Sequence, residues 1–460
     1  MVNDHLYKLQ IKKRMKYNIS IFLVLFGLGI GIAQEKKWTL QECVTYAVEN
    51  NLTIEQYELD LQSTSLDKSD AFGDMLPNLN SSVSTSSSKG LVLDPTTNSY
   101  VSSTIFSASG GVTSSMNLFD GLRNIHNLNR AKLNELASQY RLDDLKDDIR
   151  LSVANAYLQV VSNKESLKVF KAQFAVTEQD LKRTKELVNS GVVPRGDLLE
   201  IEATAASQEQ QIVNAENSVI ISRINLAQLL QITDYDSFDI AEEEFEIPPS
   251  DILSNSPKTI FDKALTFRND MKFSEANVEL AAKDVDIAKG ALYPTVGAFL
   301  NYNTRYSNQT RNPFTGDRIG FTDQLWMNDG LSYGLQMNIP IFNGFSVKNN
   351  ITRSKINLEK AKLQFVQDKL DLEVNINQAY VDVIGFSKAY EAAEKTLEAR
   401  RLAYDYSKER FEVGLMNAFD FSQAQSRVDN AAAEVIRTKY DYIFRLKVLE
   451  FYFGIPIALE

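Results

Sequence analysis

The sequence predicts a mainly α-helical fold with a small β part, built from long, coiled-coil-like helical hairpins and four β-strands per chain. Three observations support this prediction. The chain repeats itself at a spacing of 223 residues, and each repeat contains a long run without proline. Each repeat also changes its apolar spacing from every second residue to every third or fourth at one short motif. The two copies of that motif read LFDG at 118–121 and IFNG at 341–344.

The duplication extends well beyond this motif. From residue 119 to residue 232 the second copy follows the first without a gap, and upstream DMLPNL at 74–79 faces ALYPTV at 291–296 after a change of offset. We therefore predict a first repeat over 34–238, a connecting segment over 239–256 and a second repeat over 257–460. The acidic run at 239–251 is interpreted as a solvated connection. The clearest equivalent pairs are Phe119 and Phe342, Gly121 and Gly344, Arg130 and Arg353, Tyr157 and Tyr380, Gly191 and Gly414, and Asp197 and Asp420.

Residues 1–33 differ from the rest of the chain. Five basic residues from Lys8 to Lys16 precede the apolar run ISIFLVLFGLGIGIA, which ends in small residues before Gln34. This pattern is typical of a secretory signal peptide cleaved after Ala33, with Met1 or Met15 as its start. The alternative, a membrane-anchoring helix, is disfavoured because the run is short for a bilayer span. Since no long apolar run follows, we expect a chain that is exported and either stays soluble or crosses a membrane as β-strands.

Composition argues against several classes of function. The formal net charge is −11, and cleavage after Ala33 would remove five basic residues and one acidic residue, leaving −15. A chain this acidic is a poor partner for nucleic acid. Cleavage would leave His126 and Cys43 as the single histidine and cysteine, so we expect no disulfide within the chain, no Cys/His metal site and no cofactor. Cys43 is interpreted as a small apolar helix residue.

Each repeat has the same predicted order of elements. A helical stretch, at about 39–72 and 257–291, ends at a proline. Strands follow over about 77–119 and 294–342, and a long helical hairpin occupies about 121–232 and 344–454. The first helix of each hairpin is about 70 residues long, which makes a rod of about 100 Å. Its apolar residues form a narrow seam, at Ile149, Val153, Ala156 and Val160 and at Leu372, Ile376, Ala379 and Val383.

The strand before the second motif has one apolar and one polar face. Leu331, Tyr333 and Leu335 alternate with polar residues that include Gln336 and Asn338, and the first copy has Ser115 on the equivalent polar face. Four strands do not close a barrel, and open strand edges are not tolerated in lipid. Two chains would give a filled eight-stranded barrel, whereas three would give twelve strands and a wet lumen. We therefore expect a trimer with a 12-stranded barrel and a helical tunnel.

The order of these features resembles the outer membrane efflux protein family, the TolC-like channels. The resemblance rests on the signal peptide, the duplication, the proline before the strands, LFDG and IFNG after them, and a glycine six residues before an aspartate at each helical turn. It implies a homotrimer in the lipid of the cell outer membrane, with a tunnel that extends into the periplasm. It also implies a periplasmic adaptor, an inner-membrane pump of RND or ABC type, export of substrate, and no enzymatic activity.

The resemblance assigns function to the hairpin tips at 189–200 and 412–423. It implies adaptor docking at Gly191, Val192, Val193, Gly414, Leu415 and Met416. The residue pattern alone predicts helix C-caps at Gly191 and Gly414 and N-caps at Asp197 and Asp420. The strand-to-helix junctions are placed at Phe119, Gly121, Phe342 and Gly344, where glycine permits the change of backbone direction.

The family's tunnels close at the tips, and the resemblance implies a periplasmic gate here. Asp420 matches the first position of a cation-selective aspartate ring, whereas Gln423 stands where a second aspartate is often found. Asp197 matches the acid of a closing network whose aromatic and arginine positions are occupied here by Phe411 and Met416. The network's hydroxyl and guanidinium are therefore missing, and Arg195 is the candidate substitute for the arginine.

Two loops and one rival function complete the predictions. Residues 89–98 and 307–326 are rich in turn-forming residues and are expected as surface loops between strands. The rival is a non-conducting, structural trimeric surface stalk or adhesin, which would share the long helices and the export signal. An enzyme is disfavoured because one histidine and one cysteine give no nucleophile–base pair.

Overall fold

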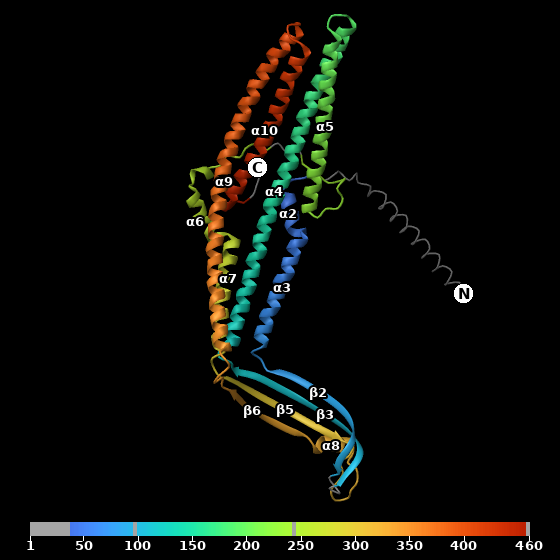
Figure 1. The fold of residues 1–460 in the computed structure, drawn as a ribbon, viewed down its shortest axis with the longest axis vertical. Coiled ribbons are helices and arrows are strands. Elements are labelled where there is room, and N and C mark those ends of the chain that lie inside the picture. Colours follow the sequence, from blue (N-terminus) through green and yellow to red (C-terminus); the bar gives the residue numbers. More distant parts are fainter. Residues whose placement is uncertain (1–36, 95–98, 242–244, 457–460) are drawn as a thin grey trace, which may run out of the picture. The chain divides into compact units, whose positions relative to one another are not determined.

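The computed structural model describes residues 37–94, 99–241 and 245–456, which fold into two compact units (Figure 1). Unit 1 takes its residues from Met1–Ile54, Lys146–Lys263 and Asn375–Glu460, and unit 2 from Glu55–Leu145 and Ala264–Val374. Each unit combines segments of both predicted repeats, so the division in space crosses the division in sequence. The predicted signal peptide, residues 95–98 of the first predicted loop and residues 242–244 of the acidic segment lie outside the described residues.

The architecture is mainly helical with one four-stranded sheet, which confirms the predicted fold class. The described helices of the first half are α2 (Leu40–Asn50), α3 (Leu52–Gly73), α4 (Arg123–Asn189) and α5 (Arg195–Leu229). Those of the second half are α6 (Pro257–Phe267), α7 (Asn269–Gly290), α8 (Phe321–Met327), α9 (Ser346–Glu412) and α10 (Ala418–Tyr452). Over the residues that the structure covers, no helix combines the length and the apolar character needed to cross a membrane.

Two helical stretches predicted as continuous are interrupted. Asn51 separates α2 from α3, and its side-chain oxygen accepts the backbone N–H of Thr53 at 2.9 Å. This bond occupies an N–H at the start of α3 and replaces the continuous helical ladder. Arg268 separates α6 from α7 with an extended backbone, and its guanidinium donates to Asp270 at 2.9 Å. The predicted stretches at 39–72 and 257–291 are therefore each a pair of helices.

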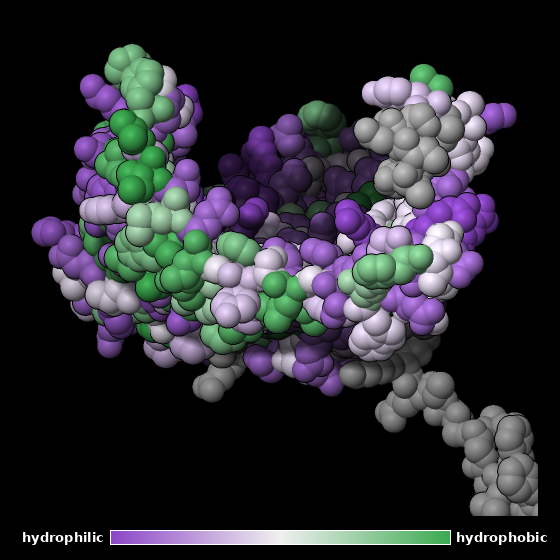
Figure 2. Space-filling view, turned by 90° about the horizontal axis from the view of Figure 1, so that it is seen from below, coloured by the Kyte–Doolittle hydropathy of each residue, from purple (hydrophilic) through white to green (hydrophobic). Residues whose placement is uncertain are grey.

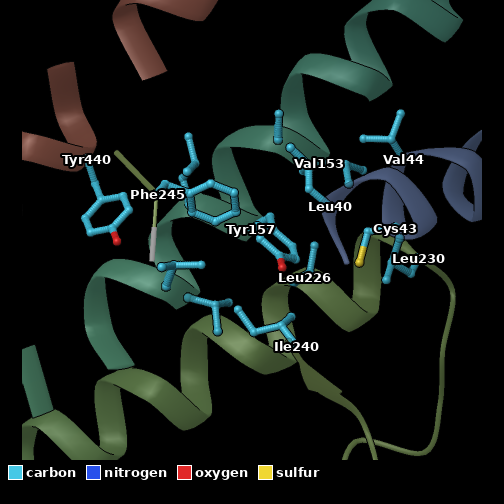
Figure 3. Packing of buried hydrophobic residues seen from close by; sticks show 14 of the residues in the cluster. Leu40, Cys43, Val44, Val153, Tyr157, Leu226, Leu230, Ile240, Phe245 and Tyr440 are labelled. Carbon is cyan, nitrogen blue, oxygen red and sulfur yellow. The ribbon is translucent and has the colours of Figure 1, made fainter. Parts of the chain in front are cut away.

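The core of unit 1 surrounds Tyr157 of α4, which is fully buried (Figure 3). Cys43 of α2 and Leu226 of α5 belong to the same apolar cluster, and both are inaccessible to solvent. The predicted seam of α4 supplies Val153 and Val160 to this cluster. Burial of these side chains stabilises the packing of three helices at one level, and Cys43 behaves as the small apolar residue that its position predicts.

Tyr157 and its equivalent Tyr380 make equivalent hydrogen bonds to the backbone. The Tyr157 hydroxyl donates to the carbonyl of Trp38 at 3.3 Å, and the Tyr380 hydroxyl donates to the carbonyl of Leu253 at 3.3 Å. Trp38 belongs to β1 (Lys37–Trp38), which pairs in parallel with β4 (Asp239–Ile240). Each tyrosine therefore fixes the segment that leads into a short helix of its own repeat.

The sheet of unit 2 has the strand order β2-β3-β5-β6, with all neighbours antiparallel. Its strands are β2 (Asn78–Asp94), β3 (Ser99–Phe119), β5 (Thr295–Ser307) and β6 (Gly330–Asn338). The predicted loop at 89–98 is wrong over 89–94, which continues β2. The predicted loop at 307–326 contains the start of α8, whose Gln324 is buried and receives the backbone N–H of Ser307 at 2.9 Å.

The two faces of this sheet differ in polarity as the alternation predicts. Leu331, Tyr333 and Leu335 of β6 are all more than 60% exposed on one face. On the other face, Ser84 and Ser109 exchange a hydrogen bond of 2.8 Å across β2 and β3. Figure 2 views the chain from the sheet end and shows hydrophobic residues gathered over the outer surface there. An exposed apolar face opposite a serine-rich face indicates two different solvents.

Strand changes to helix at a pair of left-handed residues in each half. Gly121 has φ +74° and Leu122 φ +66°, and Gly344 and Phe345 repeat this with +62° and +68°. Gly121 needs to be glycine for two reasons. Its φ is positive, and a Cβ at this position would lie 2.1 Å from the carbonyl oxygen of Gly290. The glycine therefore permits both the turn and a direct backbone contact between α4's entry and the end of α7.

We predict that Gly121→Ala abolishes accumulation of folded protein, because the added methyl overlaps the Gly290 carbonyl. Gly414→Ala is the matched control, since Gly414 has φ +75° but nothing within 4 Å of its Cβ position. It should cost only the left-handed strain, about 1–2 kcal/mol. The measurement is the yield and apparent melting temperature of detergent-extracted protein. Equal stability of the two variants would contradict the close contact.

Candidate functional site

The tips of the two long hairpins form the candidate functional site. α4 ends at Asn189 and α9 ends at Glu412, and each is followed by a glycine with positive φ, Gly191 at +73° and Gly414 at +75°. After each glycine the next backbone N–H reaches back to the helix: Val192 donates to Leu187 at 2.9 Å, and Leu415 donates to Arg410 at 2.8 Å. This is the Schellman arrangement, so both predicted C-caps are confirmed.

The predicted N-caps are wrong by three residues. The caps are Pro194 for α5 and Asn417 for α10, so Asp197 and Asp420 occupy the third helical position. Asn417 accepts the N–H of Asp420 at 2.8 Å and donates to its carboxylate at 3.0 Å. Pro194 makes no side-chain cap bond. Both aspartates therefore sit in a first turn, where the helix dipole favours a negative charge.

The tips expose apolar side chains. Val192 is 67% exposed, Val413 69% and Leu415 71%. Val193 and Met416, which are less exposed, line a cavity of about 410 Å³ between the two tips. The exposed valines are β-branched and have few side-chain conformations to lose, which suits contact with another protein.

The cavity is closed on one side by an aromatic stack inside the second hairpin. Phe411 and Phe421 stack with ring centroids 4.6 Å apart and nearly parallel planes, and Tyr404 stacks on Phe421 at 5.6 Å. Phe421 is almost fully buried. Phe411 is thus part of the packing that holds α9 to α10, and Asp197 lies on the opposite wall of the same cavity.

A half-buried acid, Asp180, lies in the cavity wall. One carboxylate oxygen of Asp180 is inaccessible and accepts no hydrogen bond from the described residues. Burial raises the pKa of Asp180, and the charges of Lys408 and Arg183 oppose that rise. Arg183 Nη1 also pairs with Glu412 Oε1 at 3.1 Å, which ties the end of α4 to the end of α9. No feature of the sequence predicts this pair, because its two members do not occupy equivalent positions in the repeats.

The predicted gate residues are only partly brought together. Asp197 lines the cavity with Phe411 and Met416, whereas Asp420 is exposed on the first turn of α10. Among the described residues, no hydrogen bond or ion pair joins Arg195 to Asp197, and Arg195 does not line the cavity. The connection between the hairpins runs through Arg183 and Glu412 instead.

Farther from the tips, a row of buried polar contacts joins the two hairpins. Thr204 and Ser422 share a hydrogen bond of 2.5 Å, Gln208 donates to Asp429 at 2.7 Å, and Gln425 donates to Thr177 at 2.6 Å. Burial raises the pKa of Asp429 to about 6. The side-chain oxygen of Gln208 is buried without a partner among the described residues. Because one of its buried polar atoms has no partner, this row stabilises the packing of the two hairpins less than the apolar contacts around it.

A comparison with protein-family models finds one match. The model described as outer membrane efflux protein matches residues 44–230 and 260–454, which together are most of the chain and fall one in each half. The chain belongs to the outer membrane efflux protein family. Members of this family are channels of the outer membrane, and the two hairpin tips and the sheet described above are therefore parts of an outer membrane efflux or secretion channel.

Similar proteins and structures agree with the family assignment. The chain is 22% identical over 337 residues to the outer membrane efflux protein BepC of Brucella suis, covering 72% of this chain and 69% of that protein. It is 23% identical over 326 residues to the outer membrane protein TolC of Vibrio cholerae, covering 69% of each. Its fold is similar to that of the CmeC outer membrane channel of Campylobacter jejuni, with a TM-score of 0.78, 19% identity, and coverage of 90% and 85%.

We predict that Asp429→Asn stabilises this outer membrane efflux protein at neutral pH. Between the ordinary carboxyl pKa and about 6, the folded protein keeps a proton that the unfolded chain releases, so stability falls as pH rises through this window. Above it the penalty is complete, up to about 3 kcal/mol. An asparagine would carry no charge and could donate to the unpartnered Gln208 oxygen.

The measurement is the apparent melting temperature at about pH 2.5, well below the ordinary aspartate pKa of 3.8, and at about pH 7.5. The variant should melt higher than the wild type at the upper pH, and the two should converge at the lower pH, where Asp429 is protonated in both states. Asp371→Asn, an exposed aspartate of α9, should leave the profile unchanged. A wild type that is no less stable at the upper pH than the variant would contradict a buried charge at Asp429.

Proposed function

We propose that three copies of the chain form one duct, with a 12-stranded barrel in the outer membrane and a helical tunnel in the periplasm. The observation that supports this most directly is the sheet of unit 2. It has four strands, two unpaired edges at β2 and β6, and one apolar face opposite one polar face. Unpaired edges are not stable in lipid, and twelve strands leave a water-filled lumen where eight do not.

The duct would connect an inner-membrane pump of RND or ABC type to the exterior through a periplasmic adaptor. The tips support this role because they expose Val192, Val413 and Leu415 on rigid Schellman turns. We propose Gly191, Val192, Val193, Gly414, Leu415 and Met416 as the docking surface. The pump would choose the substrate, and the chain would supply the conduit without enzymatic activity of its own.

A gate at the tips would control the conduit. A threefold axis near the second tip would bring three Asp420 carboxylates together and concentrate cations there. Asp197, Arg195 and Phe411 would be the other gate residues, of which Asp197 and Phe411 line one cavity. The ion pair of Arg183 with Glu412 would hold the two tips of one chain together in the closed state. Opening would require the two hairpins of each chain to separate along the polar row that ends at Gln208 and Asp429.

A structural stalk or adhesin is the alternative function. It would use the same long helices, but it would have no need of a sheet with a serine-rich face opposite an apolar face, nor of membership in a channel family. Extraction distinguishes the two: an outer membrane duct requires detergent, whereas a stalk held by other proteins is released by salt.

We predict that Asp420→Asn weakens the cation selectivity of single channels in planar bilayers, because it removes the charge from the proposed ring. The measured quantity is the reversal potential in asymmetric salt. Asp236→Asn, an exposed aspartate in the segment before β4, should leave it unchanged. An unaltered reversal potential in Asp420→Asn would reject the ring, and the absence of any conductance from purified wild-type protein would reject the duct.

We predict that Leu415→Asp blocks export in cells and leaves conductance intact, because it places a charge on the proposed docking surface. Leu402→Asp on α9 is the matched control, since Leu402 is 58% exposed but lies almost three helical turns before the tip. The measurements are substrate sensitivity of cells and capture of the adaptor by cross-linking. Full export by Leu415→Asp would exclude Leu415 from the docking surface.

A further inference from the structure

The sheet repeats its own strand pairing. In the first hairpin Asn78 lies opposite Ser115, and in the second Thr295 lies opposite Asn338. Thr295 follows Asn78 by 217 residues, and Asn338 follows Ser115 by 223, the same two offsets that relate the repeats before and after the strands. Equivalence in sequence is therefore equivalence in register. The contact that the first repeat makes with the second inside one chain therefore predicts the contact that the second repeat makes with the first repeat of another copy.

Within unit 2 the two repeats meet along one interface. β3 pairs with β5, with Val112 opposite Tyr302. Where the sheet meets the helices, Gly121 contacts Gly290, the last residue of α7. One helical level farther, Arg130 of α4 pairs with Asp284 of α7 at 2.5 Å.

The equivalent residues of all three contacts lie at the two open edges of unit 2. Figure 1 shows β2 and β6 at opposite edges of the sheet, with no strand beyond either. Adding 223 to the first-repeat residue of each in-chain contact and subtracting 217 from the second-repeat residue gives the equivalent pair. These pairs are Leu335 with Thr85, Gly344 with Gly73, and Arg353 with Asp67. Gly73 is the last residue of α3, as Gly290 is of α7. Unlike Gly121 and Gly290, neither Gly73 nor Gly344 has any atom within 4 Å of its Cβ position.

Apolar residues at the same edges are exposed where their equivalents are covered. Leu133 and Tyr140 of α4 pack against a buried cluster that includes Ala276 of α7, which is 6% exposed. Their counterparts on α9, Ile356 and Leu363, are 53% and 70% exposed, and Leu59 of α3, the counterpart of Ala276, is 57% exposed. The in-chain interface therefore has an uncovered duplicate, divided between the α9 edge and the α3 edge of the same unit.

We propose that this duplicate is the interface between copies, in which β6, Gly344 and Arg353 of one copy meet β2, Gly73 and Asp67 of the next. The inference rests on the proposed trimer and specifies its register. It sets Leu335 opposite Thr85 and Met337 opposite Val83 on the apolar face, and Gln336 opposite Ser84 on the polar face. A slip of one residue would place Leu335 opposite Ser84 and mix the two faces.

Disulfide trapping tests this register. The variant Thr85→Cys/Leu335→Cys, made in a Cys43→Ala background, should form covalent dimers and trimers under a mild oxidant and no larger species. A bond within one chain is excluded, because the two edges are three strand spacings of about 4.8 Å apart and a disulfide needs Cα atoms within about 7 Å. The matched control Val112→Cys/Tyr302→Cys joins the equivalent in-chain pair and should yield only internally bonded monomers.

Shifted pairs test the alternatives. Thr85→Cys/Leu331→Cys, displaced by four residues along β6, and Thr85→Cys/Gly334→Cys, on the opposite face, should cross-link at least tenfold more slowly, since their Cβ atoms lie beyond bonding distance.

A charge exchange tests the helical level independently. Arg353→Asp should lower the temperature at which detergent-extracted trimers dissociate, because it sets two carboxylates against each other. Adding Asp67→Arg to the same chain should restore that temperature. Adding Asp284→Arg should not, since Asp284 serves the in-chain pair with Arg130.

The outcomes separate this inference from the proposed function. Trimers by native mass that cross-link fastest at a shifted pair, or that Asp67→Arg fails to rescue, would overturn the register and leave the trimeric duct standing. Wild-type protein that remains monomeric in detergent and in bilayers would overturn the trimer, and the register with it. Fast trapping at 85 and 335 together with charge rescue would establish both.

Discussion

The backbone of Gly121 lies directly against the backbone of Gly290, and the arrangement of unit 2 depends on this contact. It joins the two repeats at the one level where every strand must become a helix. A side chain at either position would force α4 and α7 apart directly beside the pairing of β3 with β5. The neighbouring pair of Arg130 with Asp284 is exposed and contributes little energy, but it fixes the axial position of the two helices.

Most of the fold could be predicted from the sequence because its signals are repeated. The seam residues Val153 and Ile376 recur at the same place in each half, and both are fully buried. The breaks at Asn51 and Arg268 could not be predicted in this way. The two positions carry different residues, and both breaks are made by local hydrogen bonds, of Asn51 with Thr53 and of Arg268 with Asp270. Asparagine is a preferred N-cap and gave a local signal for the first break, whereas arginine is a good helix former and gave none for the second.

The tips were located by their glycines, but their chemistry was only partly foreseen. Gly191 and Gly414 mark the turns because few other residues adopt their φ. The pair of Arg183 with Glu412 and the row through Thr204, Gln208 and Asp429 join helices from different repeats. No spacing within one helix reveals which residue of another helix lies opposite, so such contacts appear only in the structure.

The two tips are also not copies of each other, since Pro194 begins one helix without a side-chain bond and Asn417 begins the other with two. In a ring of three chains these two kinds of turn alternate six times around the axis. A partner made of identical subunits would meet two kinds of binding position. One is stiffened by the ring of Pro194, and the other is held by the Asn417 amide, whose hydrogen bonds to Asp420 can break. Because both halves belong to one chain, alternate positions of such a ring can differ in sequence, which they could not if every position were the same half.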